Sequence, residues 1–577
     1  MQWRVAGRRQ TPWREMAILA LITCCYYPAF GQAPARALPY RWVYLSTNLL
    51  PDENLPQAEA LMRRAAKDGY TGIVLADYKF NILDRMDDRY FQHVAAIKAL
   101  AKELKLELIP CVFPIGYSDG LLQHDPNLIE AMPVKDSVFA VQGGKADLVP
   151  DPDAAIKNGG FEEAQGEKAT GWDLQDSPGI GSFIDRQITH SGSASLRLEN
   201  IGQADPQYGH GRIAQKVILK PFRYYRLSFW MKTCGFDTPG DVNVAILPPD
   251  PTERSLAYPG LGVKSDQDWT LHQALFNSQN NREAMLYIGV WGGKHGALWI
   301  DDVKLEEIGL VNVVRREGCP LVVRGEDGTV YTEGRDFQPV RDEKLGQGDP
   351  YDLYHTPPSI VLTSNSRIKE DQRLLVSFYH PVFVYDMQAT CCLTDPKVYA
   401  LLRDQMQRVE KLFHPSAVFM SHDEIRVANW CALCQAQHKT PGQLLADNVR
   451  RCIEIVKKTS PQARIYVWSD MFDPYHNAHD NYYLVNGTWA GSWEGLTPDV
   501  GIVDWYFDAR KKDLPWLAAR GHKQILAGYY DGDPDYIATW LNDGKDVRGI
   551  AGVMYTTWQN KYDDLEKFAQ AAWGGGK

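Results

Sequence analysis

The sequence predicts an α/β protein, a (β/α)8 TIM barrel that is interrupted after its third strand by an all-β sandwich insertion. Short β-rich segments alternate with helical segments in residues 41–113 and again in residues 395–558, an order that implies a parallel sheet. Between these regions, from about residue 150 to residue 381, strands occur without helices. Three strands before the insertion and five after it make eight, the number in a closed barrel.

Each barrel element is expected from its own segment. The first part contains strands at residues 41–46, 71–77 and 106–113, separated by helices at 56–67 and 90–104. In the second part, a helix begins at Asp395-Pro396 and runs to about Phe413, and a strand ending at Asp423-Glu424 follows it. A helix at 443–458 and strands at 464–470, 501–507, 523–530 and 549–558 complete the pattern.

The first β-rich part of the insertion opens with Asn158-Gly159-Gly160-Phe161-Glu162 and closes with the strand at 298–305. With the segments at 191–196 and 225–232 between them, this order resembles jelly-roll carbohydrate-binding modules of the galactose-binding-like type. The resemblance implies a jelly-roll fold, with two alternative roles, sugar binding or a structural spacer, because such modules serve as both. Such modules often hold a structural calcium, and the sequence assigns no ligands for one.

A second β-rich stretch covers residues 310–381. Glu326-Asp327-Gly328 between two apolar runs predicts a hairpin. The run at 374–379 is either the last strand of this stretch or a ninth barrel strand. We prefer the first alternative, because no helix links this run to the third barrel strand. The expected parts are therefore a signal peptide (1–33), barrel (34–150), jelly roll (151–309), β-rich linker module (310–383) and barrel (384–577).

The net charge of the chain restricts its binding partners, and its amino-terminal segment indicates where the protein is located. The net charge of −10 argues against a nucleic-acid partner, since phosphate neutralisation needs a basic face. Four arginines, an apolar run at 16–30 and Gly31-Gln32-Ala33 follow the order of a secretory signal. No later run is long enough to predict a transmembrane segment. We therefore expect a secreted or periplasmic protein.

The ten cysteines include the motif Cys431-x-x-Cys434, with His438 close by. One such motif with a single histidine lacks the four ligands of a structural zinc site. An oxidising compartment favours a disulfide or unreactive thiols here. The sequence thus predicts no metal site and no cofactor.

Asp423 and Glu424 directly follow the apolar run Ala417–Met420 and are the central candidates for chemistry. Neighbouring residues of a strand point to opposite faces, so an adjacent acidic pair is poorly tolerated inside a sheet. At the carboxyl end of a barrel strand both side chains can turn toward a pocket, which is where barrel enzymes place their active sites. We therefore predict that this pair is catalytic.

Further polar and aromatic residues follow the other predicted strands. The expected substrate-binding residues are Asp77, His422, Trp468, Asp470, Trp505, Tyr506 and Trp558, together with Arg41 on the first strand. Converging carboxylates and indole rings suit a pyranose, because carboxylates accept from hydroxyls and rings pack on the C–H face. Each residue also has a structural alternative: His422 as a core histidine, the tryptophans as core, and Asp470 and Asp531 as helix caps.

Two segments carry a family resemblance. The helix that starts at Asp395-Pro396 and leads to His422-Asp423-Glu424, and the later run Trp468-Ser469-Asp470, resemble glycoside hydrolase family 20, the β-N-acetylhexosaminidases. The resemblance implies substrate-assisted retaining hydrolysis of a 2-acetamido sugar. By resemblance, Glu424 protonates the leaving oxygen and Asp423 orients the acetamido group, whose carbonyl oxygen attacks the anomeric carbon. Tyr506 is expected to bind that carbonyl, and Trp468, Trp505 and Trp558 to wall the pocket.

The chain departs from the family pattern at three places. Ser421-His422 stand where the family has two glycines, and Asn560 stands where it has a glutamate. Arg41 matches the family's sugar-binding arginine, although its neighbours do not follow the pattern. We therefore expect the substrate to be another 2-acetamido sugar or a decorated one.

Two rival functions remain open at the level of the sequence. The first is a conventional two-carboxylate retaining glycosidase, in which Glu424 is the acid/base and Asp531, just after the seventh strand, is the nucleophile. The second is a carbohydrate-binding protein without catalysis. All three readings share an oligo- or polysaccharide partner.

Overall fold

The computed structural model describes residues 38–346, 351–385 and 388–575, and the predicted signal peptide lies outside them. The chain divides into two compact units. Among the described residues, the first comprises 38–77, Asp87–Pro110 and 501–575, and the second comprises Tyr78–Met86 and Cys111–Val500. Within the described part of the chain, no helix combines the length and the hydrophobicity that a membrane span requires.

Eight strands form a closed barrel in chain order, which confirms the predicted strand number. The pairs within this barrel are parallel. The strands are β1 (Tyr40–Thr47), β2 (Gly72–Asp77), β3 (Glu107–Val112), β21 (Ala417–Met420), β23 (Arg464–Trp468), β25 (Gly501–Asp504), β26 (Gln524–Ala527) and β27 (Ile550–Tyr555). Their side chains are largely buried, as expected for strands of a parallel sheet that is covered on both faces.

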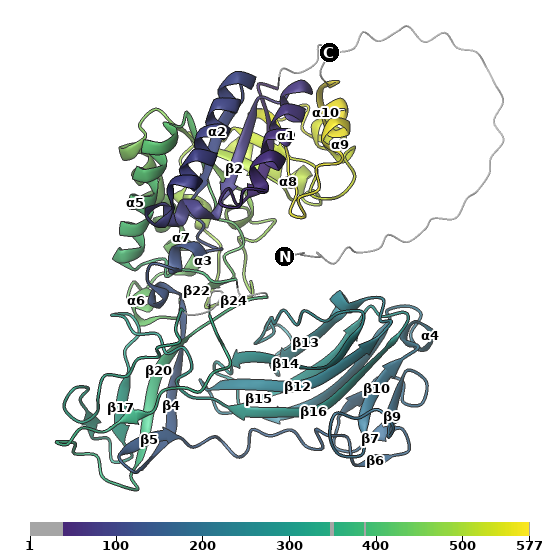
Figure 1. Cartoon of the computed structure of the whole chain (residues 1–577), viewed down its shortest axis with the longest axis vertical. Coiled ribbons are helices and arrows are strands. Elements are labelled where there is room, and N and C mark those ends of the chain that lie inside the picture. Colours follow the sequence, from purple (N-terminus) through teal and green to yellow (C-terminus); the bar gives the residue numbers. More distant parts are fainter. Residues whose placement is uncertain (1–37, 347–350, 386–387, 576–577) are drawn as a thin grey trace. The chain divides into compact units, whose positions relative to one another are not determined.

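The four predicted helices form close to their expected positions: α1 (Asn54–Lys67), α2 (Asp88–Leu104), α5 (Pro396–Phe413) and α7 (Pro441–Thr459). Asp395 caps α5 by accepting the backbone N–H of Lys397, and Pro396 occupies the first turn, where no N–H is needed. In the first unit, α1 and α2 lie side by side (Figure 1). The shorter helices α8 (Arg510–Ala519), α9 (Tyr536–Asp543) and α10 (Leu565–Trp573) follow β25, β26 and β27.

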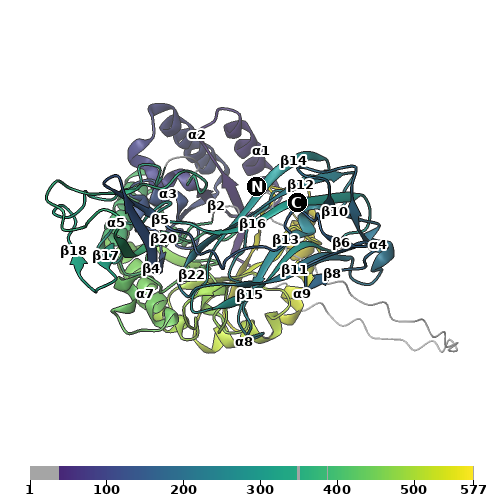
Figure 2. The same ribbon diagram turned by 90° about the horizontal axis from the view of Figure 1, so that it is seen from below.

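The segment that resembles carbohydrate-binding modules forms a sandwich of two antiparallel sheets, visible as two layers of strands in Figures 1 and 2. One sheet has the order β14 (Gln267–Asn277), β12 (Tyr224–Cys234), β16 (Ala297–Glu307), β10 (Ser195–Glu199), β9 (Ser182–Asp185). The other has the order β13 (Val242–Leu247), β15 (Glu283–Trp291), β11 (His210–Ile218), β8 (Leu174–Gln175). Apolar residues of both sheets, including Phe229 of β12 and Ile288 of β15, share one core.

A separate six-stranded sheet has the order β18 (Val330–Tyr331), β17 (Val322–Gly325), β20 (Arg373–Pro381), β4 (Ala131–Gln142), β5 (Lys145–Leu148), β19 (Ile360–Val361). The predicted hairpin before Val330 is confirmed by the antiparallel pairing of β17 with β18. The predicted run at 374–379 lies in β20 and therefore belongs to this sheet, not to the barrel.

The strands β4 and β5 precede the boundary that the sequence places at residue 150, yet they pair within this six-stranded sheet. The cause is long-range: β4 pairs antiparallel with β20, whose residues come far later in the chain. No local pattern indicates such a partner. The barrel strands of the first part therefore end with β3, and the chain leaves the barrel there.

Candidate active site at the carboxyl end of strand β21

Three carboxylates meet in the second unit, just after two neighbouring strands. Asp423 and Glu424 follow β21, Asp470 follows β23, and these strands pair in parallel. Oδ2 of Asp470 accepts the backbone N–H of Glu424 at 2.8 Å and the amide of Asn477 at 3.0 Å. The structure thus brings three predicted site residues together, and Asp470 positions the backbone of the acidic pair.

The backbone of Glu424 has a left-handed conformation, with φ of 48°. A non-glycine residue in this region carries strain that the surrounding structure has to sustain. Besides the contact to Asp470, the carbonyl oxygen of Glu424 accepts the amide of Gln388 at 2.9 Å. Gly116, in the loop after β3, lies so close that an added Cβ would be 2.0 Å from the carbonyl oxygen of Asp423.

This close approach predicts that Gly116→Ala destabilises the protein. The methyl group would push the loop after β3 away from Asp423, and such overpacking costs about 1–3 kcal/mol. Urea unfolding measures the effect. Gly160→Ala is the matched control, because an added Cβ there meets atoms only at 3.9 Å. Equal stability of the Gly116 variant and the wild type would contradict the contact.

The side chain of Glu424 is held as an ion pair. Its Oε2 lies 2.7 Å from Nη2 of Arg426 and also accepts the hydroxyl of Tyr117. The Arg426 guanidinium in turn donates to Gln388 and lies over the rings of Tyr385 and Tyr483, at 5.3 and 5.0 Å from their centroids. The ion pair and the hydrogen bond therefore hold the side chain of Glu424 in one orientation.

The pKa values of the other two carboxyls, Asp423 and Asp470, are raised. Burial, with a further contribution from the Glu424 charge, raises the pKa of Asp423 to about 6. Burial, with the charges of Asp423 and Glu424, raises the pKa of Asp470 well above its usual range. The hydroxyl of Ser421 donates to Oδ1 of Asp423 at 2.6 Å and opposes the first shift. The site therefore combines one paired anion with two buried carboxyls that hold protons more readily than free aspartate.

His422 and Trp468 are fully buried. Nε2 of His422 lies 3.2 Å from Oδ1 of Asn448 on α7, and burial lowers the pKa of His422 to about 4, so the ring is neutral at physiological pH. Trp468 packs edge-on against Phe419 of β21, with ring centroids 4.9 Å apart. Both residues match their structural alternatives, a core histidine and a core tryptophan.

Two residues that the sequence predicts as substrate ligands are used by the fold of the first unit. Arg41 lies at the amino end of β1, where its guanidinium donates to the carbonyls of Leu38 and Gly69 and lies over the ring of Trp573. Active-site residues of barrels come from the opposite, carboxyl ends of the strands, so the position and contacts of Arg41 favour a structural role. Oδ2 of Asp77 accepts the hydroxyl of Tyr90 and the backbone N–H of Leu49.

The predicted aromatic residues of the first unit lie near the carboxyl ends of β25, β26 and β27. Trp505 stacks on Tyr530 with centroids 5.0 Å apart, and Tyr530 meets Trp558 edge-on at 5.9 Å. Trp505, Tyr506 and Trp558 are half-buried. Stacked, partly exposed rings of this kind offer the flat apolar surface that a pyranose needs.

Asp531 has a different role from the nucleophile of the rival mechanism. Its Oδ1 accepts the hydroxyl of Thr557, and its Oδ2 accepts the backbone N–H of Trp558 at 2.7 Å and of Gln559 at 3.2 Å. Both oxygens are thus engaged in shaping the turn after β27. This geometry favours the structural alternative for Asp531.

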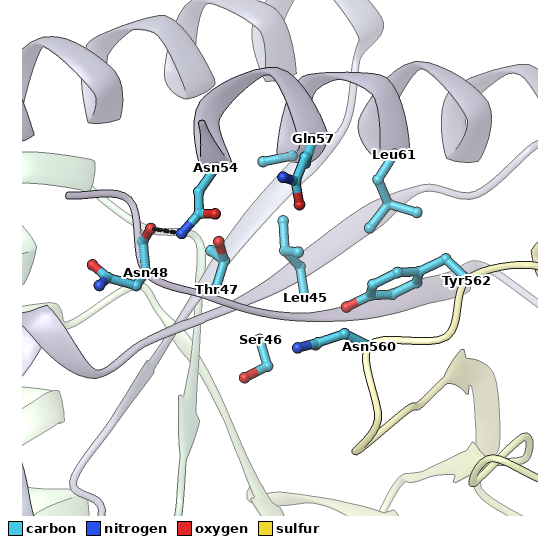
Figure 3. Close-up of a pocket in the computed structure, with 10 residues that line it drawn as sticks. Leu45, Ser46, Thr47, Asn48, Asn54, Gln57, Leu61, Asn560 and Tyr562 are labelled. Carbon is cyan, nitrogen blue, oxygen red and sulfur yellow. Dashed lines mark hydrogen bonds between the residues drawn. The ribbon is translucent and has the colours of Figure 1, made fainter. Parts of the chain in front are cut away.

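A pocket of about 230 Å³ lies at the carboxyl end of β1 in the first unit (Figure 3). Its polar lining comes from amides and hydroxyls: Ser46, Thr47, Asn48, Asn54, Gln57, Asn560 and Tyr562. Asn54 donates to the backbone carbonyl of Asn48 at 2.8 Å (Figure 3). Neutral donors and acceptors of this kind match the hydroxyl groups of a sugar. Asn560, which replaces the expected glutamate, belongs to this lining.

The residues that hold Glu424, namely Tyr117, Gln388 and Arg426, were not predicted from the sequence. The same is true of Tyr385 and Tyr483, whose rings contact Arg426. Of these residues, Tyr117 and Arg426 had a local signal. Tyr117 follows β3 by a short loop, where the strand-end argument applies, and Arg426 stands two residues after Glu424. Gln388 and the two tyrosines come from distant loops and have no local signal.

No family model matches the chain, and no curated protein matches its sequence. Parts of the chain are similar to solved structures. A family 16 carbohydrate-binding module covers 26% of this chain and 97% of its own length, with 20% identity and a TM-score of 0.18. For a xylan-binding domain from Paenibacillus barcinonensis the values are 26%, 91%, 14% and 0.20. For a chitobiase from Flavobacterium johnsoniae they are 32%, 29%, 17% and 0.25.

Proposed function

We propose that this chain is an exported glycoside hydrolase that acts on 2-acetamido sugars. The observation that carries the proposal is the pair Asp423 and Glu424 at the carboxyl end of a strand in a closed parallel barrel, joined by a third carboxylate, Asp470. Glu424 protonates the leaving oxygen, and Asp423 orients the acetamido group of the substrate. In the first unit, the half-buried rings of Trp505 and Trp558 offer a flat surface on which a sugar can stack.

The ion pair defines a condition for this function. Glu424 acts as an acid only after it leaves Arg426 and takes up a proton, so substrate binding has to displace the guanidinium and the Tyr117 hydroxyl from Oε2. Arg426 is then free to bind an oxygen of the substrate. In this proposal the ion pair belongs to the resting state, and it keeps the strained backbone of Glu424 in place until a sugar enters.

Chromogenic aryl glycosides with and without a 2-acetamido group test the proposal. We expect hydrolysis of the 2-acetamido compound, and inhibition by a thiazoline that mimics the cyclised intermediate. A covalent glycosyl-Asp531 adduct would support the rival two-carboxylate mechanism instead.

The Glu424–Arg426 ion pair also favours a second candidate, a carbohydrate-binding protein without catalysis. That candidate predicts that the wild type binds oligosaccharides, measured by calorimetry, and hydrolyses none of the chromogenic series. Hydrolysis that Glu424→Gln removes would exclude it.

Replacing Arg426 by Gln is expected to lower kcat/KM, because in this proposal the displaced guanidinium binds an oxygen of the substrate. Loss of one hydrogen bond from a charged group costs about 1.5–3 kcal/mol, or roughly 10- to 100-fold in kcat/KM. The measurement is kcat/KM with the 2-acetamido glycoside. Arg451→Gln, whose guanidinium lies over the ring of Tyr399, is the control and should keep the wild-type value. An unchanged kcat/KM in the Arg426 variant would contradict the substrate-binding role of Arg426.

A further inference from the structure

Four buried side chains from three separate segments meet in the second unit. They are Glu130, just before β4, Cys392, after β20, and Cys431 and Cys434 of the Cys-x-x-Cys motif. Their ligand atoms all lie within 4.8 Å of one another. Over residues 38–575, apart from the undescribed gaps, this is the one group of at least three histidine, cysteine or acidic ligands with such spacing.

The sulfur positions suit a metal better than a disulfide. Sγ of Cys392 lies 3.6 Å from Sγ of Cys431 and 3.6 Å from Sγ of Cys434. Tetrahedral zinc with Zn–S bonds of about 2.3 Å places its sulfurs roughly 3.8 Å apart. A disulfide needs about 2.05 Å, and one disulfide would leave the third thiol against a buried carboxylate. All three cysteines carry free thiols in the structure, so the disulfide alternative for the motif is not formed.

Glu130 is oriented in the way that a ligating carboxylate requires. Its Oε1 accepts the backbone N–H of Trp430 at 2.7 Å and that of Cys431 at 2.9 Å. Its Oε2 faces Sγ of Cys434 at 3.8 Å. One oxygen is therefore anchored by the backbone while the other points at the thiols. Metal ligands are commonly held by outer hydrogen bonds of this kind.

The residues around these four side chains stabilise negative charge. The side chain of Arg316 is 2% exposed and reaches to 4.0 Å from Oε2 of Glu130. The hydroxyl of Thr394 lies 3.2 Å from Sγ of Cys434 and 3.4 Å from Sγ of Cys392. Burying several anions is costly without a counter-charge. With all four groups ionised, a divalent cation neutralises half of that charge, and Arg316 neutralises part of the rest.

We propose that Glu130, Cys392, Cys431 and Cys434 bind one zinc ion as a structural site. Three thiolates select a soft cation such as Zn²⁺ over Mg²⁺ or Ca²⁺. All four tetrahedral positions come from the protein, so no position is left for water or substrate, and the site is structural rather than catalytic. His438, the neighbour considered from the sequence, is not in the group; Cys392 and Glu130 complete it.

This zinc ion joins the start of the six-stranded sheet, the segment after β20 and the segment after β22 (Val427–Ala428). The last of these directly continues from Arg426, so the site fixes the chain on one side of the acidic pair. The expectation of no metal, drawn from a single Cys-x-x-Cys motif, is revised by this proposal.

The test starts with the full chain, purified without chelators. Elemental analysis is expected to find about one zinc ion per chain. After removal of the metal under reducing conditions, titration with Co²⁺ alone should produce thiolate-to-cobalt charge-transfer absorption and the visible bands of tetrahedral cobalt. These two measurements on the wild type decide the question even where a variant fails to fold.

The variants Cys392→Ser and Cys434→Ser should bind Co²⁺ at least about 10-fold more weakly, since ligand loss exceeds the effect of losing an outer-shell partner. Cys452→Ser on α7 is the matched control, because this buried thiol lies outside the group, and it should bind Co²⁺ like the wild type. Two results would overturn the proposal: Co²⁺ bound without thiolate absorption, or a chain without zinc whose mass is about 2 Da low because a disulfide has formed.

Discussion

Replacing Glu424 by Gln is expected to lower the turnover of a 2-acetamido glycoside by about 10²- to 10⁴-fold, the usual contribution of a general acid. Gln keeps the shape of the side chain and an oxygen that accepts the Tyr117 hydroxyl, so the fold should survive. The loss should be largest for substrates with a poor leaving group, because a good leaving group departs without protonation. The measurement is kcat/KM over a series of aryl glycosides with leaving groups of different pKa.

Glu454→Gln, an exposed change on α7, is the control for this experiment and should retain full activity. A uniform loss across the whole series would show that Glu424 has another role than proton donation. Full activity in the Glu424 variant would remove the pair from the chemistry altogether.

Asp423→Asn is expected to make the protein more stable at neutral pH and to abolish turnover of 2-acetamido substrates. The folded state raises the pKa of Asp423 from 3.8 to about 6, mainly by burial. A carboxyl whose pKa is raised on folding stabilises the fold below the unfolded pKa, and this contribution is lost as the pH rises through the folded pKa. A shift of about two units corresponds to a cost of roughly 3 kcal/mol at pH 7.

Urea unfolding of the wild type and the variant at several pH values between 4 and 8 measures this effect. The Asn variant should be more stable at pH 7 by about 1–3 kcal/mol, with a difference that disappears toward pH 4. Asp447→Asn is a control of opposite sign: although burial raises its pKa, hydrogen bonds from Lys439 and Arg450 lower it overall. That variant should lose stability at neutral pH. A pH-independent difference for Asp423→Asn would contradict the raised pKa.

The activity of the Asp423 variant separates two roles. If Asp423 orients the acetamido group, its loss harms 2-acetamido substrates far more than plain glucosides. Equal losses on both substrate types would indicate a general structural role.

The proposed catalytic pair makes the folded protein less stable. The buried acid is unfavourable for the fold at neutral pH, and the left-handed backbone of Glu424 adds strain beside it. Asp470 and Gln388 compensate by binding the backbone N–H and C=O of Glu424. A site that is costly to fold and is held by dedicated partners is typical of functional positions.

The sequence by itself determined the eight barrel strands, the long helices and the acidic pair after β21. The strands and helices follow from local hydrophobic periodicity. The acidic pair follows from the rule that barrel enzymes place active-site residues at the carboxyl ends of their strands. Both signals lie within a few consecutive residues. Arg41 shows where such local rules stop: its residue type suits a sugar ligand, whereas its place at the amino end of β1 favours a structural role.

Only the tertiary structure decided what surrounds the pair. Glu424 meets Tyr117 from a loop 307 residues away in sequence, and Gly116 lies against the same turn. Glu130 reaches Cys434 across 304 residues, which turns an incomplete cysteine motif into a four-ligand set. Contacts of this kind follow from how β3, β4, β20 and β21 pair, and pairing between distant strands leaves no local trace in the chain. The physical reason is that proximity in a folded chain is created by packing, whereas sequence patterns record only the preference of each segment.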